Sequence, residues 1–322
     1  MHLGSSNNGA PCRAPERTDV SAAEVASGYL SRSYTDAFKN IGRVEPFGMT
    51  GGHVLLRSIP SSDRKDISGP YPIFACTNWS ALGQALNEPS ENAVTLTLVT
   101  DPFCPLSEVE ISQLFDFHQP FHDHWLIDLS SPIAPSPHHR RKLRRTGRFR
   151  IESGPADPKF ANRFVKLYAH LVAKKKISDL RAFSPKNLGA QLSVPGAWLI
   201  TSWDENELLG ADLYYREGRI VRAHLSAYAP KGYANCISYP MMLAAIEQFR
   251  LSADVIDLGG APAVEGHSEG GGVGHFKRGW TRLTRPSYLC GKVFDREAYK
   301  ALSKGRHTRW FPAYREGEYS GS

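Results

Sequence analysis

Apolar and polar positions along the chain repeat with two different periods. Short runs that alternate, such as "AVTLTLVT" (93–100) and "HWLIDL" (124–129), predict β-strands. The segment 157–177 instead repeats every three to four residues, which predicts an amphipathic helix. Its apolar side carries Phe160, Phe164, Leu167, Leu171 and Val172. Strands separated by helices predict an α/β or α+β fold with mixed, mainly antiparallel sheets flanked by helices.

A Ser/Pro-rich connector, "SSPIAPSP" (130–137), divides the chain into two halves. In the first half we expect strands at 52–60, 71–79, 93–100 and 124–129, a short helix at 80–89, and a helix with the capping-box pair Ser107 and Glu110. In the second half we expect helices at 137–146, 157–177, 184–192, 238–253 and 296–305. Its expected strands are 148–153, an antiparallel meander at 196–205, 208–217 and 219–229, and then 254–260 and 287–295.

All the net charge lies in one short stretch. The chain of 322 residues has 39 Lys and Arg against 32 Asp and Glu, a net charge of +7. The stretch "HHRRKLRRTGRFR" (138–150) holds the whole excess and no acid. Most charged helices are simply solvated, but like charges four residues apart, as at Arg140 and Arg144, oppose helix formation. Phosphate groups of a partner would offset that repulsion. The pattern also places His139, Leu143 and Thr146 on one buried stripe.

Composition excludes several classes of protein. Hydrophobic residues make up 41% and charged residues 22% of the chain, as in a globular protein, and no apolar run is long enough for a transmembrane helix. The N-terminus has no apolar core of a secretory signal, and five scattered cysteines suggest neither a disulfide framework nor a zinc site. We therefore expect a cytoplasmic protein without a transmembrane segment.

The order of elements, together with five motifs, resembles one acyltransferase family. The motifs are "HRRKLRRTGRFRIE", "LLGADLYYREGRIVRAHLSAY", "YPMMLAAIEQF", "VIDLGG" and "HFKRGW". They are similar to the Gcn5-related N-acetyltransferase (GNAT) superfamily, in its FemABX-like and BioF2-like branch, well over 120–300 and weakly over 50–120. The resemblance implies two GNAT-like halves: a degenerate one at 26–135 and an acyltransferase half at 136–305, between a flexible tail at 1–25 and a loose tail at 306–322.

The resemblance also implies a reaction and a site. An acyl group would pass from acyl-CoA or aminoacyl-tRNA, used as a co-substrate and not as a tightly bound cofactor, to an amine on a small molecule or a peptide or cell-wall precursor. Backbone N–H groups near Leu225, Ser226 and Ala227 would hold the acyl carbonyl. Gly232, Tyr233 and Ala234 occupy the place of a phosphate loop, although Ala229 departs from the family pattern and an ordinary turn fits equally well.

Lys277, which follows Phe276 in "HFKRGW", would lie near the donor and stabilise negative charge; alternatively it packs its stem on Trp280. Asp257 and His275 are the acid/base candidates, with Asp257 orienting the amine, pairing with Lys277 or only closing its own loop. His224 is expected to be a satisfied core histidine. The glycine-rich segment 265–276 is expected to be a flexible loop, able to act as a lid.

The charged stretch supplies the phosphate or tRNA contacts in this hypothesis. The residues concerned are Arg140, Arg141, Lys142, Arg144, Arg145 and Arg148. Two alternatives stay open: a non-catalytic module that binds RNA or another polyanion, and a metal hydrolase built on His118, His122, Asp123 and His124. Acyl transfer requires no metal, so the second of these is not favoured.

Overall fold

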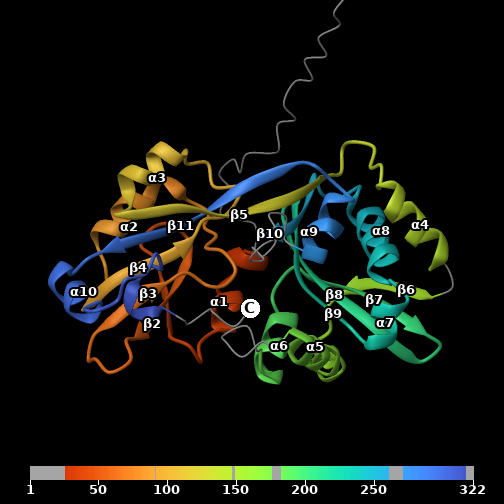
Figure 1. The fold of residues 1–322 in the computed structure, drawn as a ribbon, viewed down its shortest axis with the longest axis horizontal. Coiled ribbons are helices and arrows are strands. Elements are labelled where there is room, and N and C mark those ends of the chain that lie inside the picture. The colour runs from red at the N-terminus through yellow and green to blue at the C-terminus, as the bar shows by residue number, and fades with distance from the viewer. Residues whose placement is uncertain (1–25, 91, 147–148, 176–182, 261–270, 317–322) are drawn as a thin grey trace, which may run out of the picture.

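A computed structural model describes residues 26–90, 92–146, 149–175, 183–260 and 271–316. Within these residues the strands form one 11-stranded sheet in the order β1-β2-β3-β4-β11-β5-β10-β9-β8-β7-β6. Figure 1 shows the sheet running along the long axis of the molecule, with helices on both of its faces. The α/β class with a mixed sheet is therefore confirmed.

The first part of the sheet is built from the strands β1 (Arg43–Pro46), β2 (His53–Ser58), β3 (Lys65–Ser68), β4 (Ala93–Val99), β5 (Phe117–Asp128) and β11 (Thr284–Val293). The second part is built from β6 (Arg150–Pro155), β7 (Ala197–Asp204), β8 (Glu207–Glu217), β9 (Ile220–Tyr228) and β10 (Val255–Gly260). The predicted meander is confirmed, because β7, β8 and β9 pair antiparallel in sequence order.

One strand lies in the other half from the one expected. The strand expected at 287–295 belongs to the predicted second half, but as β11 it pairs antiparallel with β4 and β5 of the first half. In the opposite direction, Tyr29 and Tyr34 near the start of the described chain pack in one core cluster with Phe164 and Tyr215 of the second half. Each half therefore contains a segment from the other part of the chain, and the boundary at residue 135 does not separate two independent units.

Most of the helices lie close to their expected positions, but those at 32–36, 230–234 and 271–278 are not among the expected helices. The helices are α1 (Arg32–Asp36), α2 (Leu82–Asn87), α3 (Glu108–Leu114), α4 (Pro137–Arg145), α5 (Ala161–Lys175), α6 (Pro185–Leu192), α7 (Pro230–Ala234), α8 (Ser238–Phe249), α9 (Gly271–Arg278) and α10 (Arg296–Leu302). Short 3-10 turns occupy Gly28–Leu30, Trp79–Ala81, Pro158–Phe160 and Ala313–Arg315. The predicted capping box is present: the Ser107 side chain accepts from the Glu110 backbone N–H, and the Glu110 carboxylate accepts from the Ser107 N–H.

Two apolar cores cover opposite faces of the second half of the sheet. On one face Leu213 and Tyr215 pack with residues of α5 and α6. On the other face Tyr214 and Val221 pack with residues of α8, and Trp280 joins them. Figure 1 shows α5 and α6 below the sheet and α8, α9 and α4 on its other side. The sheet thus separates two environments, and the site residues are divided between them.

Three sequence expectations differ from the structure. The segment 71–79, rich in β-formers, contributes only an isolated bridge between Phe74 and Thr100. Residues 271–276 of the expected glycine-rich loop begin helix α9, and 261–270 lie outside the described residues, as does the tail 1–25. The described part of the C-terminal tail is not loose, because Phe311 and Tyr314 are buried and Arg315 forms an ion pair with Asp66.

Candidate active site

The centre of the sheet opens where β9 leaves β10. These parallel strands pair from Ile220 opposite Val255 to Arg222 opposite Asp257. Beyond that point β10 continues along β5, with Gly260 opposite His124, while β9 continues only along β8. Among the described residues, the edge of β9 from Ala223 to Tyr228 therefore has no strand partner on its β10 side. We call this stretch the open edge of β9. It includes Leu225, Ser226 and Ala227, whose backbone was predicted to hold the acyl carbonyl.

A buried arginine marks the point of separation. Arg222 is 1% exposed and pairs with three carboxylates: Asp101 at 2.7 Å, Asp257 at 2.9 Å and Glu217 at 3.1 Å. Burial alone would lower the pKa of Arg222, but the three carboxylates outweigh it and raise that pKa above its ordinary value. The three acids come from β8, β10 and the segment after β4, so this ionic cluster ties the two halves together.

Asp257 and His124 form a buried pair beside Arg222. The His124 Nδ1 lies 3.0 Å from both carboxylate oxygens of Asp257, and the Gly259 N–H donates to the same carboxylate. Burial raises the pKa of Asp257, but His124, Arg222 and the Gly259 N–H together hold it well below its usual range. Asp257 is therefore a fixed anion that orients His124, a role in which a carboxylate selects one tautomer of an imidazole.

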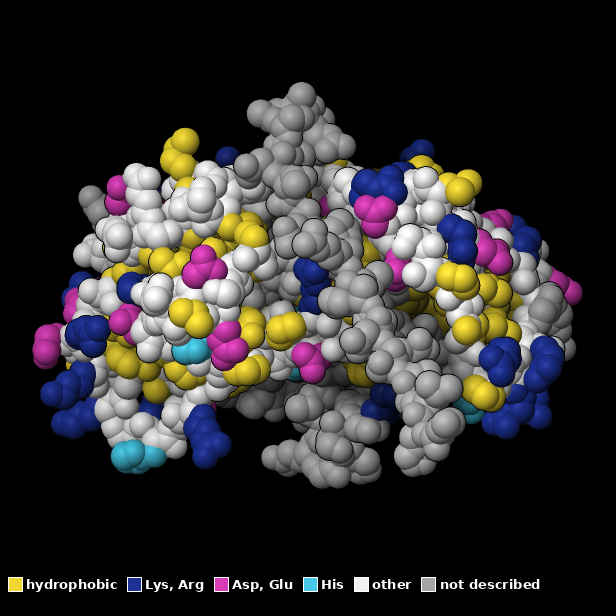
Figure 2. Space-filling model, turned by 90° about the horizontal axis from the view of Figure 1, so that it is seen from above, with side chains coloured by type: hydrophobic (Ala, Val, Ile, Leu, Met, Phe, Trp, Pro, Cys, Tyr) yellow, Lys and Arg dark blue, Asp and Glu magenta, His cyan; other side chains and the backbone are white. Residues whose placement is uncertain are grey.

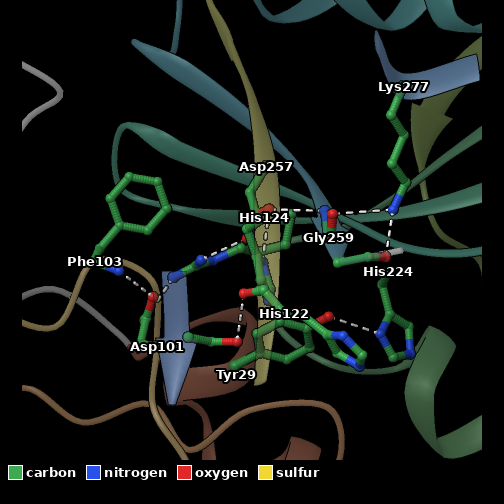
Figure 3. Close-up of polar contacts among 12 residues, drawn as sticks. Tyr29, Asp101, Phe103, His122, His124, His224, Asp257, Gly259 and Lys277 are labelled. Atoms are coloured by element: carbon green, nitrogen blue, oxygen red, sulfur yellow. Dashed lines mark hydrogen bonds and ion pairs between the residues drawn. The ribbon is translucent and has the colours of Figure 1, made fainter. Parts of the chain in front are cut away.

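Lys277 reaches the end of β10 from helix α9. Its Nζ donates to the carbonyl oxygens of Gly259 at 3.0 Å and Gly260 at 2.7 Å, as Figure 3 shows in part. Burial lowers the pKa of Lys277 to about 8, and attraction by Asp257 raises it only partly. An ammonium has three donors, so one N–H of Lys277 remains for a ligand. The predicted ion pair between Lys277 and Asp257 is absent from the described contacts.

His122 lies close to the same group on strand β5. Burial together with the charges of His124 and Lys277 lowers the pKa of His122 to about 4. Its imidazole is therefore neutral over the physiological range. A side chain at position 260 would collide with His122, since a Cβ there would lie 2.5 Å from the His122 Cβ. The glycine that ends β10 thus lets the two strands approach closely beside Lys277.

The structure separates the other two predicted histidines from this group. His275 is exposed on α9, with its ring centroid 5.3 Å from that of His138, so it lies beside α4 and not with Asp257. His224 lies on the opposite face of the sheet from α8, where its ring nitrogens meet the Tyr29 hydroxyl at 3.0 Å and Gln191 Oε1 at 2.8 Å. Burial lowers the pKa of His224 to about 3. The expectation that it is a satisfied core histidine is confirmed.

The expected phosphate loop is a helical turn packed against β8. Gly232, Tyr233 and Ala234 belong to α7. A Cβ at Gly232 would lie 2.3 Å from the Leu209 carbonyl oxygen, so this glycine is needed for close packing. The Tyr233 ring stacks under the Lys174 ammonium at 3.7 Å. Phe276 likewise packs in the apolar core beneath α8. Tyr233 and Phe276 therefore have structural partners, and Gly232 has a packing role.

The basic helix α4 stands beside the start of α8. Its expected stripe is confirmed: His139 and Thr146 are buried and Leu143 packs against the core. His139 fastens α4 to α9, because its Nε2 lies 2.8 Å from the Phe276 carbonyl oxygen. Figure 2 shows Lys and Arg side chains gathered at both ends of the long axis, and one of these is the end at which Figure 1 places α4.

The basic side chains of α4 have no acidic partner in the part of the chain that the structure describes. No described Asp or Glu lies within the 4.0 Å of an ion pair from the five basic side chains of the helix, which are Arg140, Arg141, Lys142, Arg144 and Arg145. Arg148 lies outside the described residues. Lys142 approaches the turn before α8, with its Nζ 3.3 Å from the Cys236 Sγ. The helix therefore presents uncompensated positive charge beside the first turn of α8.

Sequence reasoning missed Arg222, Asp101 and the pairing of His124 with Asp257. One signal was available for Arg222, because a charged residue between Val221 and Ala223 in an apolar strand must find buried partners. No local signal identified those partners, since Asp101 lies 121 positions away. The sequence pattern suggests His124 only as a metal ligand. The described residues contain no group of three or more His, Cys, Asp or Glu side chains suited to a metal ion.

Two further observations concern the rest of the described structure. A cavity of about 670 Å³ lies between α1 and α6, lined by Asp36, Lys39 and Lys186 among others, and it contains none of the predicted site residues. None of the helices in the described ranges is long and apolar enough to cross a membrane.

The fold is that of known GNAT-like proteins. No protein-family model and no curated protein matches the sequence. Solved structures do match. FemX has 11% sequence identity and a TM-score of 0.62, and the match covers 87% of this chain and 95% of the FemX chain. The C-terminal domain of an Agrobacterium fabrum protein described as a putative lysylphosphatidylglycerol synthetase matches at 13% identity with a TM-score of 0.60. This match covers 86% of this chain and 91% of that domain. L-PGS from Bacillus licheniformis matches at 14% identity with a TM-score of 0.54, covering 84% and 94%. The chain therefore has a GNAT-like, FemX-like fold.

Proposed function

We propose that this protein is an N-acyltransferase in which an acceptor amine directly attacks an activated acyl donor at the open edge of β9. The observation that carries the proposal is the placement of His124, held by Asp257, and of Lys277 around the point where β9 and β10 separate. The likeness to FemX and to lysylphosphatidylglycerol synthetase supports it.

Each residue supplies one requirement of acyl transfer. His124, oriented by Asp257 through Nδ1, accepts the proton that the amine loses as the C–N bond forms. The remaining N–H of Lys277 stabilises negative charge on the acyl carbonyl oxygen, assisted by backbone N–H groups of the open edge. No covalent intermediate is needed.

Among donors we favour aminoacyl-tRNA over acyl-CoA. The turn at Gly232 is packed against Leu209 instead of forming a phosphate cradle, whereas α4 offers five cations that have no acidic partner among the described residues. A tRNA acceptor stem has enough phosphates to use most of them, and CoA does not. The acceptor is an amine on a small molecule or on a peptide or cell-wall precursor, and we expect a cytoplasmic location.

The test measures binding and transfer with the same donors. Purified protein is titrated with acetyl-CoA, aminoacyl-tRNA and free tRNA at several salt concentrations, and transfer to a panel of amines is followed with labelled aminoacyl-tRNA and acetyl-CoA. We expect tRNA binding with a steep salt dependence, and transfer from aminoacyl-tRNA that Lys277→Ala lowers by about 100-fold. Transfer from acetyl-CoA with no response to tRNA would overturn the donor assignment.

The alternative, a non-catalytic module that binds RNA or another polyanion, rests on the same exposed cations of α4. Transfer by the wild type, together with its loss in Lys277→Ala, separates the two functions. A pure binding module retains its affinity for tRNA in this variant and transfers nothing in the wild type, whereas the enzyme loses turnover and keeps its affinity.

A further inference from the structure

A second carboxyl lies near the open edge, on the other face of the sheet from His124. Asp212 on β8 is 3% exposed. The Tyr228 hydroxyl donates to its Oδ1 at 2.7 Å, and the Ser226 hydroxyl shares a hydrogen bond with the same carboxyl. No Lys, Arg or His of the described residues lies within the 4.0 Å of an ion pair from Asp212. A buried carboxyl that is held by hydroxyls alone is unusual and requires an explanation.

Ser226 connects this carboxyl to the open edge of β9. Ser226 lies directly opposite Asp212 in the β8–β9 pairing, and Ser226 is exposed. The strands β9 and β10 are last in register at Arg222 and Asp257. Beyond this point Ser226 follows on the open edge of β9, while β10 leads to Gly260, whose carbonyl accepts from Lys277.

Asp212 and Ser226 belong to the α8 face of the sheet. Asp212 alternates in phase with Tyr214, which packs against Phe249 of α8. Lys277 also extends from a helix of this face, since its neighbour Phe276 packs in the same core. His124 and Asp257 point to the opposite face, where Arg222 lies. The two proton-carrying groups therefore serve opposite sides of a substrate that lies along the open edge.

Resting on the proposed function, we infer that Ser226 and Asp212 form a proton relay that protonates the leaving group of the acyl donor. As the amine nitrogen bonds to the acyl carbon, the bond from that carbon to the leaving oxygen breaks. The leaving oxygen takes the proton of the Ser226 hydroxyl, and Ser226 recovers a proton from the carboxyl of Asp212. The proton lost by the amine goes to His124 and leaves through solvent, so that protons balance over one turnover. Asp212 is then reprotonated from solvent.

The titration of Asp212 suits this role. Burial raises its pKa to about 6, although hydrogen bonds from Ser226 and Tyr228 lower it. The titratable groups that face it are Tyr214, Tyr228 and Tyr233, whose pKa values are raised by burial and further by the charge of Asp212. Asp212 therefore keeps its proton to a higher pH than an ordinary aspartate does. The relay thus has an acid available near neutral pH.

The experiment compares two donors that carry the same acyl group. One is an aminoacyl-tRNA, whose leaving group is a ribose hydroxyl. The other is the 4-nitrophenyl ester of the same amino acid, whose leaving group needs no proton. The variants are Ser226→Ala, Asp212→Asn and, as a matched control, Ser153→Ala, an exposed strand serine on β6. Each variant is first checked for an unchanged melting temperature, and Ser226→Ala carries the test where Asp212→Asn does not fold.

We expect Ser226→Ala and Asp212→Asn to lower kcat about 100-fold with aminoacyl-tRNA and less than 5-fold with the nitrophenyl ester, because only the first leaving group needs an acid. In the wild type the rate with aminoacyl-tRNA falls as pH rises through about 6, and Asp212→Asn removes that step. Equal losses with both donors, or no loss with either, would overturn the relay, as would a wild type that accepts only thioesters. A wild type that transfers from no donor contradicts the proposed function instead.

Discussion

Positive charge is used in opposite ways at two places in this protein. In the core, Arg222 is fully buried and meets three carboxylates. On the surface, α4 carries five cations that no described carboxylate approaches. The buried ion pairs of Arg222 hold the two halves together, because removing either partner leaves the other charge buried without compensation. Like charges without such partners repel one another and destabilise their own helix, and phosphate groups of a ligand would offset that repulsion.

The largest effect is expected in the core. Arg222→Met leaves Asp101, Glu217 and Asp257 buried without their shared cation, so the free energy of unfolding should fall by about 3–5 kcal/mol. Urea denaturation measures this change. Arg219→Met is the matched control, since Arg219 pairs with Asp254 at the surface, and it should alter stability little. Similar stability for both variants would show that the buried cluster does not hold the halves together.

A smaller effect is expected on α4, and it concerns binding. Replacing Arg140, Arg141 and Arg144 by Ala should raise KM for aminoacyl-tRNA about 10-fold or more and leave kcat unchanged, with a shallower dependence on salt. Stability should not fall, because the repulsion within the helix is relieved. The control replaces Arg43 and Arg296, exposed cations that have carboxylate partners in the first half. An equal loss of affinity in both sets contradicts a specific role for α4.

Lys277 shares one property with each of these two regions. It is buried like Arg222, but its hydrogen bonds among the described residues go to carbonyl oxygens and not to a carboxylate. Burial lowers its pKa to about 8, so a reaction that needs its positive charge should slow as pH rises through about 8. Lys277→Arg keeps a cation at every working pH and should shift this alkaline step upward, at a cost of a few-fold in rate. The pH dependence of kcat measures it. An alkaline step that is unchanged in Lys277→Arg assigns the titration to another group.

The stability of the wild type provides a second readout of Lys277. The unfolded chain binds a proton at this position up to about its ordinary pKa, whereas the folded chain releases it above about 8. Between these values the unfolded state binds more protons, so this residue makes stability rise with pH in that window. Lys277→Met should remove that contribution.

The sequence predicted what is decided locally. The Ser107 and Glu110 capping box and the buried stripe of His139 and Thr146 depend on residues within two turns of helix, and both are present. The strand expected at 71–79 is wrong. A high β-propensity does not provide a neighbouring strand to pair with, and Phe74 forms only an isolated bridge there. The pairing of Arg222 with Asp101 and of Arg315 with Asp66 joins positions far apart in the chain, and periodicity contains no information about such contacts.

The position of β11 also sets the order in which the protein can be completed. A ribosome releases the chain from its N-terminus, so β4 and β5 emerge long before the strand that lies between them. Their facing edges stay unpaired until residues 284–293 have left the ribosome, which is after the strands β6 to β10 have left it. Nascent β4 and β5 therefore expose strand edges that are open to the wrong partners, and chaperone dependence during synthesis is the expected consequence.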